Sequence, residues 1–576
     1  MKNFISKHIS AAAVLTMGLG MTLTGCSGLL DQAPYGTITS EQIDSTSIDG
    51  LLASAYAGLE AHYYGNNEAF AGPSTNWIFD VRSDDALKGG GALSMEANIN
   101  LLETSVLNND NVSCLNKWQN NYYAISRVHK AMLTIQGMKD PSAMDEEMAE
   151  LKFLRAFYYF DLIKIFRHIP YLNENSDATK VKNTTYSQDS IASFIITDLK
   201  EAYADLDAAP MGEASRDGHA YKEAAAALLA KVYAQRSAFG GTVQWDSVEA
   251  WCDTVINSNK YYVYLNCGDI AKTEYNNRAE SIFALQCSTS NNNMHINWSN
   301  LLNTTQGPDL YGSGDDFFLA SQNLVNAFRT NSDGLPYLDG APDTLNVNVD
   351  RNKFNGNVDP RLDYTVGRIG MPWKSTDENP TTYTEDCVRA KALYGEYSGK
   401  KFVEAPGVAR SVWPCGASGL NFNFLRYSDI LLLHAEALIE QNKNLAKARE
   451  DINEVRSKAM NSLSEYNEGI YTPVDLDGLK ANYVVNLYPA DGWTQEYARK
   501  AVRMERRLEL AMEGGRWFDL LRWGICKETM NSYFKSESKI HSYLGDASVT
   551  ENEYYLPVPK DEITNSNGLY TDPDNQ

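Results

Sequence analysis

A cysteine near the start of the chain stands where a thiol can be acylated during export. A lysine-containing start precedes an uncharged, mostly small or apolar stretch at residues 10–23, and Leu23-Thr24-Gly25-Cys26 closes it. Signal peptidases cut after a small residue, and the apolar stretch is shorter than the roughly 20 residues that span a bilayer. This spacing predicts a bacterial lipobox, in which residues 1–25 are removed and the Cys26 thiol carries a diacylglycerol. An ordinary cleaved signal is the alternative.

Adjacent carboxylates are the next groups that could do chemistry. Asp84-Asp85 and Asp315-Asp316 could be offered as the acid and base of a glycosidase. Hydrolysis needs two carboxyls that face each other across a cleft, whereas sequence neighbours on a strand point to opposite faces. Because the chain contains 74 Asp and Glu residues, such pairs also arise by chance. The two pairs therefore do not predict a catalytic site.

Motifs for phosphate, nucleophile or zinc chemistry are missing from the sequence. It has no P-loop, no G-x-G-x-x-G after a strand, no G-x-S-x-G and no H-E-x-x-H. The eight histidines are scattered, and the cysteines form no C-x-x-C pair. We predict neither a cofactor nor a metal, and we expect buried free thiols after Cys26.

Charge narrows the range of partners. The formal net charge is −23 over 576 residues. An acidic chain repels phosphate backbones and anionic surfaces, which argues against nucleic-acid binding. The 34 tyrosines and ten tryptophans can fill a core or stack on sugar rings.

The elements that would position these groups are mainly helices. Apolar residues at three- and four-residue spacing predict helices at 118–132, 148–167, 191–203, 220–235, 245–257, 426–441, 445–460 and 495–513. Between them, residues 261–425 are rich in Asn, Gly, Asp, Thr and Pro, with short apolar runs such as 281–285 that predict strands. Successive helix pairs indicate tetratricopeptide-like packing, although no such motif repeats cleanly.

These patterns predict a mostly α protein. We expect a tetratricopeptide-like helical-repeat scaffold with long irregular loop insertions and a few short strands. No Pro/Gly/Ser-rich linker divides the chain, which favours one body over residues 37–576 after a lipidated tether at 26–36. Within that body we expect a helical part at 37–260, an irregular insertion at 261–425 and a second helical part at 426–576.

Four longer motifs carry a family resemblance. They are LKFLRAFYYFDL at 151–162, RYSDILLLHAEA at 426–437, ERRLELAMEGGRWFDLLRWG at 505–524 and YLPVPKDEI at 555–563. With the lipobox, they make the chain resemble the SusD/RagB family of surface glycan-binding outer-membrane lipoproteins. Buried charges must be paired. We therefore expect the charged motif residues to lock the fold rather than bind ligand: Arg155, Asp429, Glu436, Glu505, Glu509, Arg516 and Asp519.

The resemblance implies a function and a location. It implies non-catalytic capture of oligosaccharide or polysaccharide at the cell surface, and delivery to a SusC-like, TonB-dependent outer-membrane transporter. It also implies a lipid-anchored protein on the outer membrane that faces the cell exterior. A surface glycoside hydrolase and a ligand-free scaffold subunit of the transporter complex are the alternatives.

A sugar ring offers an apolar face for stacking and hydroxyls at its edge, so a site needs an exposed aromatic beside amides or charges. Two polar segments, residues 62–85 and residues 293–316, meet this requirement, and so does Trp373. They supply the candidate glycan-binding residues Tyr64, Asn66, Trp77, Asp80, Arg82, Asp84, Asn297, Trp298, Tyr311 and Trp373. Trp298, in an asparagine-rich stretch, is the best single stacking platform, whereas core packing is about equally expected for Trp77.

Overall fold

The computed structural model describes most of the chain after residue 44. The described residues are 45–60, 72–75, 77–210, 218–289, 296–300, 302–307, 310–312, 314–341, 356–374, 381–407, 418–463 and 482–575. The expected signal peptide 1–25, the tether 26–36 with Cys26, and the candidate residues Tyr64 and Asn66 lie outside them.

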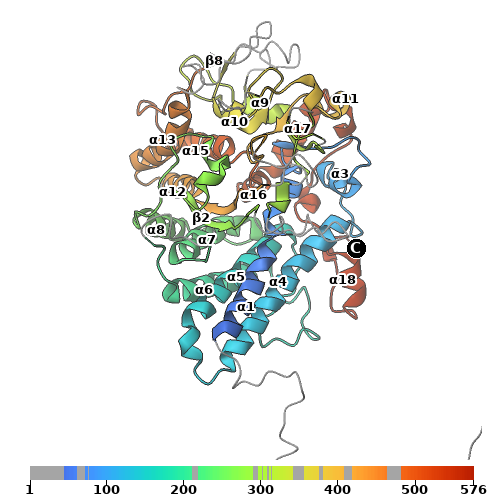
Figure 1. The fold of residues 1–576 in the computed structure, drawn as a ribbon, viewed down its shortest axis with the longest axis vertical. Helices are drawn as coiled ribbons and strands as arrows, with labels where there is room; N and C mark the ends of the chain where they lie inside the picture. Colours follow the sequence, from blue (N-terminus) through green and yellow to red (C-terminus); the bar gives the residue numbers. More distant parts are fainter. Residues whose placement is uncertain are drawn as a thin grey trace, which may run out of the picture.

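Helices make up most of the described structure (Figure 1). The longer ones are α1 (Ser45–Tyr56), α4 (Val112–Gln136), α5 (Asp145–Ile165), α6 (Gln188–Asp205), α7 (Lys222–Gln235), α8 (Trp245–Ile256), α12 (Tyr427–Glu440), α13 (Leu445–Asn461), α15 (Gln495–Glu509) and α17 (Cys526–Glu537). The shorter ones are α2 (Trp77–Asp80), α3 (Ala97–Glu103), α9 (Gln322–Ala327), α10 (Arg361–Thr365), α11 (Lys391–Tyr394), α16 (Arg516–Arg522) and α18 (Lys560–Asn565). Each predicted helix coincides with one of these to within a few residues, except that α4 is longer than its prediction.

The long helices pack side by side in chain order, as expected for a tetratricopeptide-like array. α1 packs on α4, α4 on α5, α5 on α6, α6 on α7 and α7 on α8. α8 then packs on α12, which contacts α13 and α15. The predicted fold class is confirmed, because the array continues from α8 to α12 across the irregular insertion.

Local sequence explains where several helices begin and how deeply they lie. Asn111, Ser187 and Thr494 cap α4, α6 and α15, each with a side-chain oxygen that accepts a backbone N–H of the first turn. α5 is buried on nearly every side because helices flank it on two faces, as its uninterrupted apolar character predicts.

Short strands tie the irregular insertion to the helices. The strands are β1 (Ala86–Gly89), β2 (Ser281–Leu285), β3 (Phe317–Ala320), β4 (Asn357–Val358), β5 (Val366–Gly367), β6 (Ser398–Gly399), β7 (Phe422–Arg426) and β8 (Asn482–Tyr483). They form four two-stranded sheets, antiparallel for β1–β3, β2–β7 and β5–β6 and parallel for β4–β8. β7 leads directly into α12, so its pairing with β2 fixes the insertion against the helix array.

Candidate functional site

The structure brings together the two polar segments that the sequence singled out. β1 pairs with β3 in the register Ala86 to Ala320, and the hydroxyl of Ser321 donates to the carbonyl of Asp84 at 2.7 Å. A short 3₁₀ turn at Pro73–Thr75 also contacts the 3₁₀ turn Trp298–Asn300. Segments about 220 residues apart in the chain therefore meet at one place.

Trp298 is a half-buried side chain at the start of an anchored turn. The Asn297 amide donates to the carbonyl of Leu420 at 2.8 Å, and the Asn300 amide donates to the carbonyl of Phe402 at 2.8 Å. These bonds hold the turn on both sides of the indole. Asn297 is itself buried because its amide anchors the turn, which corrects its assignment to an exposed site.

Asp80, Arg82 and Asp84 are also buried, which corrects their assignment to an exposed site. The Arg82 guanidinium lies 4.2 Å from the ring centroid of Trp517 and donates to the carbonyl of Glu553. Asp84 accepts from Arg516 at 2.8 Å. Protein groups therefore engage the Arg82 guanidinium and the Asp84 carboxylate.

Burial also sets the ionisation of these two aspartates. Asp80 has no basic partner among the groups that act on it, and burial followed by the nearby Asp85 charge raises its pKa to about 8. Burial opposes ionisation of Asp84 as well, but the neighbouring arginines overcome it and lower the pKa of Asp84.

Tyr311 and Trp373 lie together, but in a small buried cluster rather than on a surface. The Trp373 indole N–H donates to the Tyr311 hydroxyl at 2.9 Å, and that hydroxyl donates to the carbonyl of Glu404. Trp373 stacks on Tyr383 with ring centroids 5.3 Å apart. Their prediction as exposed stacking platforms is wrong, because both rings are fully covered.

Four candidate residues remain, and the structure describes the side chain of one of them. Tyr64 and Asn66 lie outside the described residues, and so does the side chain of Trp77 at the start of α2. Trp298 is therefore the candidate aromatic that is described and partly exposed.

Neither acid pair is arranged as a hydrolytic couple. Asp84 and Asp85 are buried and pair with Arg516 and Arg507, each with a shortest contact of 2.8 Å. Asp316 accepts from the Ser398 hydroxyl at 2.8 Å, and burial raises its pKa to about 6. In both pairs the side chains are engaged by the protein itself.

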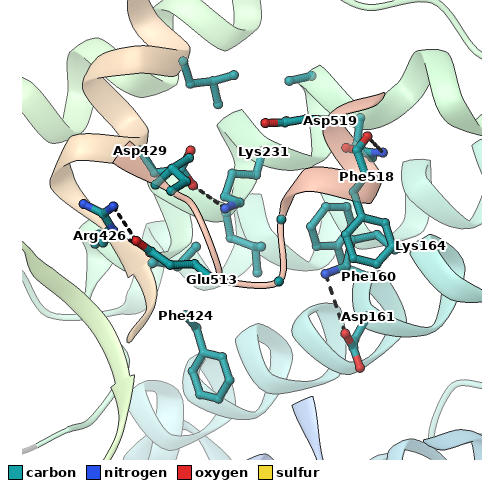
Figure 2. A pocket seen from close by; sticks show the side chains of 18 of the residues that line it. Phe160, Asp161, Lys164, Lys231, Phe424, Arg426, Asp429, Glu513, Phe518 and Asp519 are labelled. Carbon is teal, nitrogen blue, oxygen red and sulfur yellow. Dashed lines mark hydrogen bonds and ion pairs between the residues drawn. The ribbon is translucent and has the colours of Figure 1, made fainter. Parts of the chain in front are cut away.

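A pocket of about 130 Å³ lies between the helix array and the 505–524 motif (Figure 2). Phenylalanines 160, 424 and 518 and several ion pairs line it. The pairs include Lys231 with Asp429, and Arg426 with Glu513 at 2.8 Å. The volume would hold about four water molecules and is smaller than the roughly 300 Å³ of typical ligand pockets. We assign this pocket to the junction between the helix array and the 505–524 motif, and no local pattern in the sequence predicted it.

Lys164 is the least well-paired cation of that pocket. Its ammonium lies 3.6 Å from Asp161 and 4.7 Å from the ring centroid of Phe518. Burial lowers its pKa to about 8, with the Asp161 charge opposing the shift.

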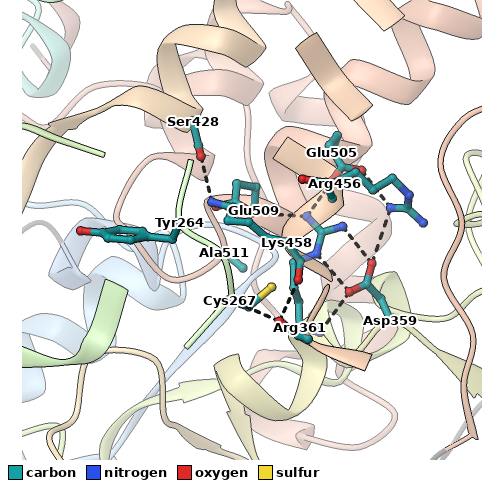
Figure 3. Close-up of polar contacts among 12 residues, drawn as sticks. Tyr264, Cys267, Asp359, Arg361, Ser428, Arg456, Lys458, Glu505, Glu509 and Ala511 are labelled. Atoms are coloured by element: carbon teal, nitrogen blue, oxygen red, sulfur yellow. Dashed lines mark hydrogen bonds and ion pairs between the residues drawn. The ribbon is translucent and has the colours of Figure 1, made fainter. Parts of the chain in front are cut away.

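The charged residues of the 505–524 motif form buried ion networks (Figure 3). Glu505 bridges Arg361 at 2.7 Å and Arg456 at 3.0 Å. Glu509 pairs with Lys458 at 2.6 Å and with Arg426 at 2.8 Å. The expectation that these charges lock the fold is confirmed, because their partners come from several other elements.

The other expected locking residues are paired in the same way. The pairs are Arg155 with Asp198 and Glu174, Asp429 with Lys231 and Arg506, Glu436 with Arg522, Arg516 with Asp84, and Asp519 with Arg506. Of the cysteines in the described residues, all six are free, and four of them are buried.

The described residues contain no group of three or more His, Cys, Asp or Glu side chains that could hold a metal ion. None of the helices in that part of the chain combines the length and the apolar character that a bilayer span requires.

A tetratricopeptide-like helix array with a loop-rich insertion defines the class of the protein, and comparison with known proteins gives the family. The SusD family model matches residues 279–574, and a model described as starch-binding associating with outer membrane matches residues 29–234. The chain belongs to the SusD family.

Individual relatives agree with this assignment along nearly the whole chain. SusD-like protein P2 of Formosa agariphila is 25% identical over 568 residues, which cover 95% of this chain and 96% of the relative. A SusD-like carbohydrate binding protein of Bacteroides fragilis superposes with a TM-score of 0.68 at 21% identity, over 92% of this chain and 99% of the other.

A third similar structure contains an oligosaccharide. Surface glycan-binding protein A of Bacteroides thetaiotaomicron, solved in complex with laminarihexaose, superposes with a TM-score of 0.66 at 18% identity. The alignment covers 92% of this chain and 99% of the other. At these identities the structural likeness concerns the fold.

Proposed function

We propose that the protein captures oligosaccharides at the cell surface without cleaving them, through a site centred on Trp298. The single observation that carries the proposal is the position of Trp298. Its half-buried ring begins an anchored turn at the place where two polar segments meet. Relatives named as carbohydrate-binding or glycan-binding proteins support this ligand class.

The physical argument rests on stacking. An indole face contacts the CH groups of a sugar ring, and a fixed ring loses little conformational entropy when it does so. The Asn297 and Asn300 amides fix the turn, so the backbone that carries the ring is already in place before a ligand arrives. Removing the ring should therefore weaken binding without disturbing the core.

The non-catalytic part of the proposal rests on how the acids are used. The two acid pairs that could suggest a hydrolase are engaged by Arg507 and Arg516 in one case and by Arg389 and Ser398 in the other. A retaining or inverting hydrolase would need two carboxyls that face a cleft wide enough for a glycan.

Anchoring and delivery complete the proposal. We infer that Cys26 is acylated, that the body faces the cell exterior, and that the protein hands its glycan to a SusC-like, TonB-dependent transporter. The lipobox and the family description of association with the outer membrane support this.

The test is a calorimetric titration of residues 27–576 with starch, laminarin and other plant, fungal and host polysaccharides, with product analysis of the same mixtures. We expect one polymer to bind with no new reducing ends. Trp298→Ala should weaken that binding about tenfold or more, equivalent to about 1.4 kcal/mol. Tyr123→Ala is the matched control, because this tyrosine is 64% exposed on α4.

The outcomes separate the alternatives. New reducing ends would establish a hydrolase. Unchanged affinity in Trp298→Ala would remove this platform, and no binding across the panel would favour the ligand-free scaffold subunit.

A further inference from the structure

A second hollow lies on the helix array, and its residues are distant in sequence from Trp298. It is formed by the connection between α5 and α6 and by the first turns of α6, and we call it the α5–α6 groove. Its lining includes Tyr171, Asn173, Ser176, Lys180, Tyr186 and Phe194. Its volume of about 340 Å³ falls within the range of ligand pockets, whereas the pocket of Figure 2 is smaller.

Three aromatic rings form the wall of this groove. The ring centroids of Tyr171 and Phe194 are 4.6 Å apart, and Tyr186 meets Phe194 edge-on at 5.1 Å and 89°. Tyr186 is 38% exposed. It stands directly before Ser187, which caps α6.

The backbone around the groove is held by buried polar contacts. The Tyr159 hydroxyl donates to the carbonyl of Leu172 and accepts its N–H, both at 2.8 Å. Arg155 pairs with Glu174 at 2.6 Å. The Asn183 amide donates to the carbonyl of Thr571 at 2.7 Å. The groove is therefore formed before any ligand binds, which lowers the entropy cost of binding.

The rim of the groove is polar and nearly neutral in charge. Asn173 and Ser176 exchange hydrogen bonds of 2.9 Å, and the Lys180 ammonium pairs with Asp177 at 2.7 Å. A ligand that suits this groove has one apolar face for the rings and several hydroxyls for the rim, and it needs no charge. A neutral sugar ring has this combination.

We propose that the α5–α6 groove is a second saccharide site, which stacks a neutral sugar ring on Tyr186. The choice of ligand class rests on the proposed function, whereas the site itself is separate and is argued from its own geometry. On a long polymer, two sites on one protein would raise the avidity beyond that of either alone.

The test follows Tyr186 directly by ¹⁹F NMR of residues 27–576 labelled with 3-fluorotyrosine. Tyr186→Phe assigns the Tyr186 resonance, and Tyr123→Phe assigns that of an exposed control tyrosine on α4. The probe is a mixture of neutral oligosaccharides from hydrolysed starch, laminarin, mannan and xylan. We expect a saturable shift of the Tyr186 resonance and none of the Tyr123 resonance.

The same titration in Trp298→Ala separates the two proposals. A Tyr186 shift that persists in this variant supports an independent second site, even where the Trp298 platform fails its own test. The inference is overturned when the Tyr186 resonance does not move at an oligosaccharide concentration of about 10 mM, because a site of millimolar affinity would be mostly occupied at that concentration. It is equally overturned when the shift disappears with Trp298.

Discussion

At the scale of single residues, several buried carboxyls have pKa values well above their ordinary range. Burial raises the pKa of Asp80 to about 8, and it raises the pKa of Glu60, Glu103 and Glu404 to about 7. A carboxyl whose pKa is higher in the folded than in the unfolded state binds more protons when folded. Its contribution to stability is therefore present at low pH and is lost as the pH rises through the folded pKa.

Asp80→Asn should reveal this effect. The amide copies the neutral carboxyl, so the variant keeps the hydrogen bond from the Gly514 N–H, which is 3.4 Å long in the native protein. Between about pH 4 and pH 8 the native protein should lose stability relative to the variant, by up to about 1.4 kcal/mol per pH unit. Urea unfolding at several pH values measures this difference. Parallel stability curves for the two proteins would show that Asp80 is ionised in the fold.

At the scale of elements, α15 is the main internal connection of the C-terminal part. It packs on α12 and α13, and its Glu505 and Glu509 pair with cations from α10, α13 and β7. A buried ion pair adds little net stability against a well-packed apolar pair, but removal of one partner leaves the other charge uncompensated.

Glu505→Gln should therefore destabilise the protein strongly. Arg361 and Arg456 keep neighbouring acids but lose the charge that lies between them, so we expect a loss of about 3 kcal/mol. Glu496→Gln on the same helix is the matched control, because Glu496 is 83% exposed and its ion pair with Lys500 is 4.0 Å long. This control should change stability by less than about 0.5 kcal/mol. Thermal unfolding measures both, and similar melting temperatures would contradict the role of the network.

At the scale of the whole molecule, the N-terminal and C-terminal parts of the described residues pack on each other. Arg507 and Arg516 reach back to Asp85 and Asp84, and the Gln119 amide on α4 donates to Glu562 on α18 at 2.8 Å. One hydrophobic cluster also contains residues as far apart as Ile48 and Val558. The body therefore closes on itself, and the membrane attachment is left to the N-terminal segment in our proposal.

Cys26→Ser should abolish that attachment. A serine hydroxyl does not replace the thiol in the lipobox, so we expect the variant to incorporate no labelled palmitate and to leave the membrane fraction. Cys287→Ser is the control, because it removes another thiol while Cys26 remains. Equal palmitate labelling in Cys26→Ser and the native protein would point to an anchor elsewhere.

Local sequence was enough to predict most of the long helices. The apolar spacing placed α5, α6, α7, α8, α12 and α13 to within a few residues, and the SIFAL run placed β2. Periodicity works here because a helix that packs on neighbours must repeat its apolar residues at its own pitch. The pairing of the charged residues in the 505–524 motif was also predicted correctly, because buried ionic residues must have partners of opposite charge.

The location of the site could not be derived in this way. Asp84 and Trp298 both stand in polar, aromatic-rich segments, yet one is a buried ion-pair residue and the other is half-buried at an anchored turn. The arginine that covers Asp84 is 432 positions away, and the rings of the α5–α6 groove are spread over residues 171–194. Sequence determined the fold family and its elements, whereas tertiary packing decided exposure, because exposure depends on distant residues that no local pattern encodes.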